Sequence, residues 1–514
     1  MSEARRHIRN LMANWICVGG TLLTLFFLSP FVVHTLGKVE YGIWSLLTVL
    51  TGYMGIFDLG VRASTGRYVI LYHGRQDHER VDETIRTSLT FFSLAGLLVV
   101  AAGFAIGIGF PTFFPSSPKA YHTLVAVLLP ILALNIWASM MGAVFSSLLA
   151  AHDRFDLARG LDLCVLVVRT AGTVAALLLG YGIAGLVPVT VACSLIALAG
   201  NYVIAKRLYP ALRTWPPVFS RARLRELFGY GIASAVSTIS YRIVGQTDLI
   251  LVGALIAVSS VTVYSVGAMV VYYSWGFLMQ IDRTFFPPVQ RAAARGDVEA
   301  VRWYYLRQIR MSLLFGIPIY IGFSVFGHPF IRLWMEDKSF PEASVTQAAL
   351  VMGVLSASKF VYLLSIGGEP LLQACGRIRL MATLAVIEAL TNLGLSVFFV
   401  LVMGWGLVGV AAGTLVSRVL VRTFIVPWQA ARTVRLRAPR FFGVVASGLL
   451  GGGAFAALCL AVRYLVPADS WLMFALQVGF VLAAYAPIGW FVLVPRDDRN
   501  RILRAIGVVS GSAS

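Results

Sequence analysis

Three short patterns in the sequence have the spacing of catalytic or phosphate-binding motifs. GYGIAG at residues 180–185 and GWGLVG at 404–409 have the glycine spacing of the dinucleotide-binding loop G-x-G-x-x-G. SASK at 356–359 has the S-x-x-K spacing of a serine nucleophile with its lysine. Such a loop would cradle a pyrophosphate on backbone N–H groups, and such a serine would attack an acyl group.

The surroundings of these patterns argue against both chemistries. Both glycine patterns lie between apolar stretches long enough to cross a bilayer, rather than between a strand and a soluble helix. SASK lies inside another such stretch and lacks the S-D-N and K-T-G companions. The sequence has no G-x-x-x-x-G-K-[ST] loop and no C-x-x-C pair. We therefore expect no enzymatic activity, no cofactor and no metal site.

Basic residues inside the apolar stretches are stronger candidates for a functional site. They are Arg62, Arg67, Arg169, Arg242, Arg283, Lys359, Arg418 and Arg422. Placing one such group in lipid costs roughly 3 kcal/mol even on the membrane-insertion scales that give the lowest values, so most of these side chains should face a water-filled protein interior. An excess of cations there favours an anionic substrate, and a planar guanidinium favours phosphate. The substrate-binding residues that we predict are Arg62, Arg67, Arg242, Arg283, Lys359 and Arg418.

Acidic residues inside the same stretches have two competing interpretations. The clearest are Asp58, Asp248, Asp282 and Glu388, which are candidates for binding a coupling H⁺ or Na⁺ and equally for forming salt bridges. Asp58 and Arg62 are four residues apart, a spacing that places them on one face of a helix. Arg283 and Arg422 lie near the ends of their stretches, where long side chains can extend to the aqueous interface. Structural roles therefore compete with binding at these positions.

The elements that position these residues are membrane-spanning helices. The 514 residues are 58% hydrophobic and 13% charged, with a mean hydropathy of +0.81. Apolar stretches of about 20 residues or more give about fourteen spans; they include 41–72, 344–372 and 407–430. The predicted fold class is an all-α polytopic membrane protein, with two six-helix lobes in parallel repeat and two C-terminal helices.

The distribution of basic residues predicts the orientation of these spans. Most of the 42 Lys and Arg residues fall in alternate loops, which the positive-inside rule places in the cytoplasm together with both termini. The predicted outer loops hold Lys38, Lys119, Arg332, Lys338 and Arg463. Because the net charge of +19 is dispersed over loops beside spans, we expect anionic membrane lipids rather than nucleic acid as its partner.

An internal repeat explains the two glycine patterns. The offset of 224 residues that aligns them also places Asp58 of GIFDLG opposite Asp282 of LMQIDR, and at an offset of 223 LLAAHDRFDL from Leu148 meets LLQACGRIRL from Leu371. We predict a duplicated six-span unit in which both glycine patterns are outer hairpins, since glycine permits the positive φ of a tight reversal. The predicted parts are an N-lobe at 1–205, a basic linker at 206–225, a C-lobe at 226–430, and helices 13 and 14 with the tail at 431–514.

The segment IFDLGVRASTGRYVI at 56–70, with its D-x-G and trailing Arg67, resembles the Wzx-type flippases of O-antigen and exopolysaccharide repeat units. These belong to the multidrug/oligosaccharidyl-lipid/polysaccharide exporter superfamily, and the resemblance extends over essentially the whole chain. It implies that undecaprenyl-diphosphate-linked oligosaccharide is moved from the cytoplasmic to the periplasmic leaflet of a bacterial inner membrane. A cationic central cavity would grip the diphosphate during alternating access.

The resemblance also implies interaction partners for the protein, and other functions compete with the flippase interpretation. The implied partners are the lipid-linked oligosaccharide, membrane lipids, and the polysaccharide polymerase and export machinery. A cation-coupled multidrug exporter and a lipid II flippase share the fold, although the excess of cations argues against cationic drugs. A membrane polysaccharide polymerase or ligase is less favoured, because such enzymes carry large outer loops and the predicted outer loops here are short.

Overall fold

The structure is a computed structural model that describes residues 3–495 and 498–500. The described residues are almost entirely helical and contain no strand, which confirms the predicted all-α class. The chain divides into two compact units, residues 1–262 and 263–514. Helix α8 (Val258–Ala294) contains the boundary between them.

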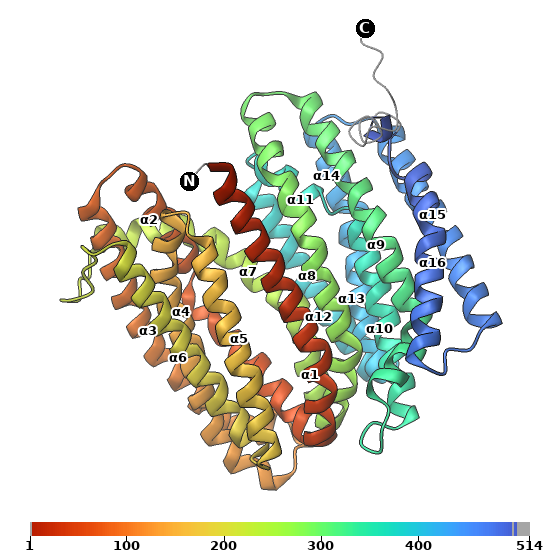
Figure 1. Cartoon of the computed structure of the whole chain (residues 1–514), viewed down its shortest axis with the longest axis horizontal. Coiled ribbons are helices and arrows are strands. Elements are labelled where there is room, and N and C mark those ends of the chain that lie inside the picture. Colours follow the sequence, from red (N-terminus) through yellow and green to blue (C-terminus); the bar gives the residue numbers. More distant parts are fainter. Residues whose placement is uncertain (1–2, 496–497, 501–514) are drawn as a thin grey trace. The chain divides into compact units, whose positions relative to one another are not determined.

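The first unit is built from long helices joined by short connections (Figure 1). They are α1 (Glu3–Met54), η1 (Gly55–Asp58), α2 (Val61–Gly74), α3 (His78–Phe113), η2 (Lys119–Tyr121), α4 (His122–Ala151), α5 (Phe155–Leu178), α6 (Gly182–Leu208) and α7 (Arg221–Leu255). Helix α4 packs against α2, α3 and α6, while α7 packs against α1, α2 and α3. The loop predicted at Lys38 is a bend in α1, where Gly37 has φ 70°.

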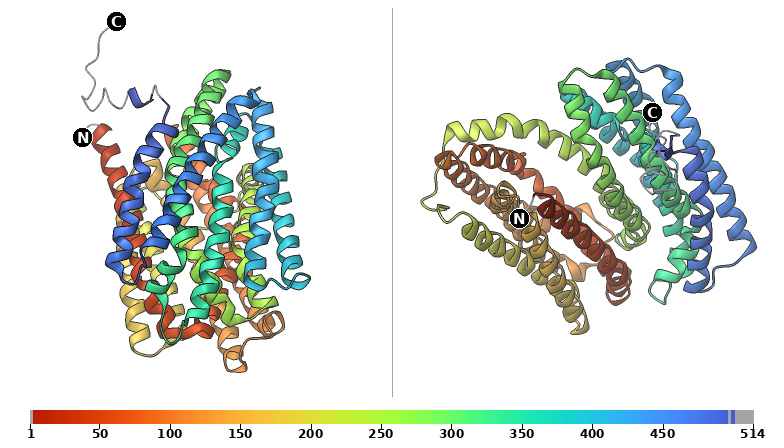
Figure 2. Two further views of the ribbon diagram at one scale, coloured as in Figure 1. Left: turned by 90° about the vertical axis from the view of Figure 1, so that its right-hand side faces the viewer. Right: turned by 45° about the horizontal axis from the view of Figure 1, so that its top comes forward.

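The second unit continues from α8 with a similar series of helices. They are α9 (Val298–Met335), α10 (Glu342–Leu363), α11 (Gly368–Ala374), α12 (Ile378–Leu401), α13 (Gly406–Arg418), η3 (Val419–Ile425), α14 (Val426–Thr433), α15 (Ala438–Leu465) and α16 (Trp471–Val492). Helix α15 lies beside α9 and α16 (Figure 2). Helices α12 and α13 pack so closely that a Cβ on Gly413 would lie 2.2 Å from Ser396 Oγ.

The length and composition of the helices make this a multi-pass membrane protein. Within the described residues, twelve helices are long and apolar enough to cross a membrane, and the first of these covers Ile16–Asp58. Many large apolar side chains on them are exposed, such as Phe27, Leu178 and Leu450, as expected for surfaces that face lipid tails. The count of fourteen spans stays a prediction.

The local geometry of the repeated segments agrees between the two units. Helices α5 and α12 each contain 24 residues. The turns after them place Gly180 and Gly182 at φ 77° and 52°, and Gly404 and Gly406 at φ 68° and 53°. The prediction that these glycines make tight reversals at positive φ is therefore confirmed. The predicted lobe boundaries and the superposition of the two copies stay predictions.

Each unit contains a helix that is interrupted inside a predicted span. The span 41–72 is broken between α1 and α2, where Leu59 and Gly60 have left-handed φ values of 50° and 77°. The span 344–372 is broken between α10 and α11. The expectation of a continuous helix was wrong in both places. Within a membrane, irregular backbone is tolerated where it is buried in protein or lines an aqueous cavity, so these breaks mark places to look for a site.

Candidate functional site

The break in the first unit carries an aspartate and an arginine. Asp58 ends η1, and its Oδ1 accepts a hydrogen bond of 2.8 Å from the backbone N–H of Arg62 in the first turn of α2. The Arg62 Nε lies 3.5 Å from the other carboxylate oxygen, and its Nη2 donates to Ser139 Oγ of α4 at 3.3 Å. The predicted contact between Asp58 and Arg62 is therefore present, at the end of a helix rather than along a continuous one.

A second arginine, Arg242 of α7, reaches the same break from the other side. Its Nη1 donates to the carbonyl oxygen of Gly52 in the last turn of α1. Tyr53 Oη donates to the Arg242 carbonyl oxygen at 3.2 Å. Both Arg62 and Arg242 lie close enough to interact electrostatically with the Asp58 carboxylate. The first unit thus brings together two of the predicted cations and one of the predicted acids.

The break in the second unit is part of a buried ionic cluster. Arg418 ends α13 and Arg422 lies in the π-helical turn η3, and both reach Glu388 of α12. Arg422 Nη2 lies 2.6 Å from Glu388 Oε2, whereas Arg418 Nε lies 3.7 Å from Oε1 and its Nη1 donates to Ser358 Oγ at 2.7 Å. Arg422, Arg418 and Glu388 are 2%, 5% and 2% exposed. The interpretation that Arg422 extends to the interface was therefore wrong.

Glu369, in the first turn of α11, links this cluster to the broken helix. Arg422 Nη1 forms an ion pair with Glu369 Oε1, and Tyr362 Oη donates to Glu369 Oε2 at 3.0 Å. The Arg422 guanidinium also lies 4.4 Å from the centre of the Tyr362 ring. The sequence analysis did not single out Glu369. Its position beside the glycine pair of SIGGEP, inside a predicted span, is the signal that marks it.

Lys359 occupies an aromatic pocket next to the same cluster. Its Nζ lies 4.2 Å from the centre of the Trp275 ring and 5.4 Å from that of Tyr272, both on α8. The Trp275 and Tyr362 rings are in edge contact, with centres 4.6 Å apart. The contacts therefore continue from the Lys359 ammonium through the Trp275 and Tyr362 rings to the Arg422 guanidinium. Aromatic faces attract a cation without neutralising its charge.

The charges of this cluster leave a positive excess. Lys359, Arg418 and Arg422 carry three positive charges, and Glu369 and Glu388 carry two negative ones. Five charged side chains in a membrane interior are costly unless they are paired, hydrogen-bonded or in contact with water. Salt bridges join Arg418 and Arg422 to the two glutamates, and Lys359 lies against the aromatic rings of Trp275 and Tyr272. The chemistry that this arrangement supports is electrostatic binding of an anion.

The remaining predicted site residues are Arg67, Arg283, Asp248 and Asp282. Arg67 and Arg283 are exposed, and the Arg67 guanidinium lies 5.9 Å from the centre of the neighbouring Tyr68 ring. Asp248 is buried in α7, 1% exposed. The side chain of Asp282 lies outside the described residues. Their predicted roles in substrate binding or ion coupling stay proposals.

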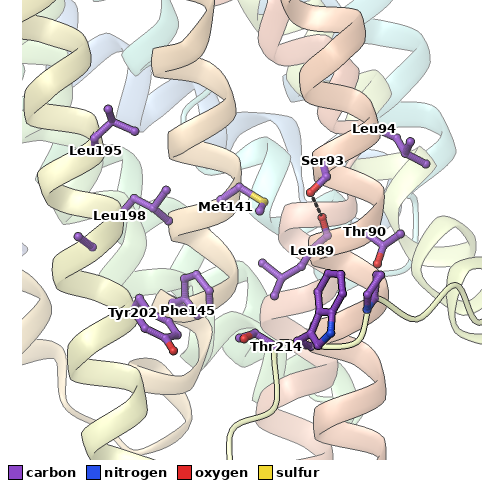
Figure 3. A pocket seen from close by; sticks show the side chains of 13 residues that line it. Leu89, Thr90, Ser93, Leu94, Met141, Phe145, Leu195, Leu198, Tyr202 and Thr214 are labelled. Carbon is purple, nitrogen blue, oxygen red and sulfur yellow. Dashed lines mark hydrogen bonds between the residues drawn. The ribbon is translucent and has the colours of Figure 1, made fainter.

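A separate cavity of about 590 Å³ lies in the first unit, among α3, α4, α6 and the segment that follows α6 (Figure 3). Its walls include Leu94, Met141, Phe145, Leu198 and Trp215. These side chains offer apolar contact and no charge. The cavity therefore lacks the charged groups that would bind an anion, and each of the two charged breaks is a better candidate.

Solved structures show which known proteins share this arrangement of helices. The chain resembles a lipid II flippase, MurJ, in an inward closed conformation, with a TM-score of 0.69, 15% identity, and coverage of 97% of this chain and 99% of the other. It also resembles a multidrug resistance transporter of the MATE family in an inward-facing conformation, with a TM-score of 0.67, 15% identity, and coverage of 81% and 96%. The chain therefore has the fold of these two solved structures, the second of which is a transporter of the MOP superfamily, and this agrees with the resemblance in the sequence.

Sequence comparisons narrow this class to a family. Residues 33–339 match the family described as polysaccharide biosynthesis protein, and the chain belongs to that family. It is 21% identical over 511 residues to an uncharacterized membrane protein, EpsK, of Bacillus subtilis, covering 96% of this chain and 97% of the other. It is 22% identical over 430 residues to a putative O-antigen transporter of Shigella flexneri, covering 81% and 96%.

Proposed function

We propose that the protein is a flippase that moves an undecaprenyl-diphosphate-linked oligosaccharide from the cytoplasmic to the periplasmic leaflet of a bacterial inner membrane. Membership of the polysaccharide biosynthesis family and the similarity to a putative O-antigen transporter support export of a glycan. The proposal involves alternating access and no chemical step. The lipid tail stays in the bilayer while the charged headgroup crosses it.

The observation that carries the substrate class is that three cationic side chains, Lys359, Arg418 and Arg422, gather in one buried cluster with Glu369 and Glu388. A diphosphate carries charges that cation-lined protein interiors stabilise, and a guanidinium can donate two parallel hydrogen bonds to neighbouring phosphate oxygens. We assign Lys359 and Arg418 to the diphosphate, together with Arg62, Arg67 and Arg242 of the first unit and Arg283 of the second.

The acidic residues would serve the return of the empty transporter. When no diphosphate is bound, Glu388 pairs with Arg418, and Asp58 pairs with Arg62. An arriving diphosphate competes with these carboxylates for the same guanidinium groups. A coupling H⁺ or Na⁺ on a carboxylate such as Glu388 or Asp248 would weaken its hold on a cation, and so would favour substrate binding.

The test is complementation of a bacterial strain that lacks the gene. We expect Arg67→Ala, Arg242→Ala and Lys359→Ala each to abolish surface polysaccharide while the protein remains in the membrane. Each change removes a charge-assisted hydrogen bond of about 1.5–3 kcal/mol, or roughly 10- to 100-fold in affinity. The readouts are surface polysaccharide by gel and membrane abundance by blot.

Two controls make this result specific. Arg295→Ala removes a cation from the exposed end region of α8, and it should leave export unchanged. Lys359→Arg keeps the charge on the aromatic faces and should retain part of the activity. Normal export from all three alanine variants would refute the assignment, and loss of the protein from the membrane would indicate structural roles instead.

A further inference from the structure

A small polar cavity lies in the second unit, away from the buried cluster. It has a volume of about 270 Å³, and it is lined by Glu299, Arg302, Arg435, Leu436, Arg437 and Arg440. The first two residues belong to the first turns of α9, and the others belong to the connection from α14 to α15 and the start of α15. The positive-inside rule assigns this end of the helices to the cytoplasm.

Arg302 has a structural role in this cavity. Its Nη1 pairs with Glu299, its Nε donates to the carbonyl oxygen of Val434 at 2.6 Å, and its Nη2 donates to that of Arg435 at 3.0 Å. These bonds hold the connection between α14 and α15 against α9. Arg302 therefore lines the cavity without adding net charge, because Glu299 balances its charge.

The other three arginines supply the unbalanced charge. The side chains of Arg435, Arg437 and Arg440 are exposed, and no hydrogen bond or ion pair joins them to another residue within the described part of the chain. Three neighbouring guanidinium groups around one concavity repel one another, which costs free energy unless an anion lies between them. Their planar forks match the oxygens of a tetrahedral oxyanion, and α15 begins here with the end of its dipole that favours an anion.

We propose that this cavity binds a phosphate group through Arg437 and Arg440, with Arg435 completing the charge. A phosphate can accept a pair of hydrogen bonds from each guanidinium, and it remains negatively charged at neutral pH both as a diester and as a free ion. The phosphate can belong to the headgroup of an anionic lipid or to a soluble molecule. Phe442, next along α15 and 63% exposed, would then lie at the level of the lipid chains.

The experiment measures binding to the purified full-length protein in neutral detergent. The probes are dioctanoyl phosphatidylglycerol and inorganic phosphate, and the readout is calorimetry with native mass spectrometry. Arg437→Ala/Arg440→Ala should weaken binding of the lipid by about 10- to 100-fold, since each arginine contributes a charge-assisted bond. The matched control Arg291→Ala/Arg295→Ala removes two exposed cations at the end of α8 and should change affinity by less than about 2-fold.

Competition between the probes distinguishes the two sources. Displacement of the lipid by inorganic phosphate shows that the phosphate group alone is recognised, and saturable lipid binding without displacement shows that a lipid headgroup is the ligand. Arg437→Lys/Arg440→Lys keeps the charge and should fall between the wild type and the alanine variant. If the alanine variant is not monodisperse, Arg440→Gln takes its place in the same comparison. Equal weakening by the control pair, or no saturable binding of either probe, would overturn the proposal.

Discussion

At the scale of single residues, charged side chains within the spans fall into two groups. Arg418, Arg422 and Glu388 are buried and tied to one another, while Arg67 and Arg283 are exposed. Charge type and position in a span are equally visible in the sequence for both groups. Which charged side chains form ion pairs cannot be predicted from the sequence, because this depends on which face of α12 packs against α13. Hydrophobic periodicity cannot specify that face for helices that are apolar almost all round.

The buried position of Arg422 leads to a prediction about stability. Arg422→Ala leaves Glu388 and Glu369 without their main counter-charge, and breaking a buried ion pair in this way costs about 3–5 kcal/mol. We expect a clear fall in the midpoint of thermal unfolding of the detergent-purified protein. Arg283→Ala, at an exposed site, should stay within about 0.5 kcal/mol of the wild type.

A double-variant cycle tests whether this loss comes from the pair. Arg422→Ala combined with Glu388→Ala should cost less than the two single changes together, because each removes the partner that the other leaves buried. Additive losses would mean that Arg422 stabilises the fold through packing alone.

At the scale of elements, the sequence predicts the tight turns between helices better than the interruptions inside a predicted span. The glycines at 180, 182, 404 and 406 indicated two tight reversals, because few other residues adopt positive φ. The break at Leu59 and Gly60 was not predicted, because apolar residues on both sides continue the hydrophobic stretch. Gly60 is the residue that permits the break. The break before α11 has a different cause, because Gly367 there has a right-handed φ of −77°. The glycine beside it allows close packing, since a Cβ on Gly368 would lie 2.6 Å from Val426 Cγ1.

The contact between α12 and α13 depends on one glycine, and this can be measured. Gly413→Ala would place a methyl group 2.6 Å from the backbone nitrogen of Ser396, an atom that cannot move without shifting α12. Overpacking of this kind costs about 1–3 kcal/mol. Gly394→Ala in α12 meets no atom within 4 Å, so it should be neutral or stabilising by up to about 1 kcal/mol. Equal unfolding midpoints for the two variants would contradict the close approach of the helices.

At the scale of the whole molecule, the repeat predicts a membrane topology. Six spans per copy return the chain to the same side, so both glycine turns should lie in the periplasm. Tyr181→Cys and Trp405→Cys, at positions 62% and 50% exposed, should react with a membrane-impermeant maleimide in intact cells. Trp215→Cys, at a position 78% exposed, should react only after the cells are broken.

The same labelling separates the alternatives. The wild type measures the background from its five native cysteines, of which Cys164 is exposed. Labelling of only one of the two turns in intact cells would indicate an inverted repeat. Labelling of Trp215→Cys in intact cells would reverse the predicted orientation, and with it the assignment of the arginine-lined cavity near α15 to the cytoplasm.

The position of Lys359 above Trp275 also gives the protein an optical reporter of its own. An indole ring has a larger dipole in its excited state than in its ground state, so a charge 4.2 Å from the ring centre changes the energy of the emitted light. An anion that draws the ammonium group away from the ring, or screens it, therefore shifts the fluorescence of Trp275. The other tryptophans form a background that the Trp275→Phe variant subtracts, which allows substrate occupancy to be followed in real time without an attached dye.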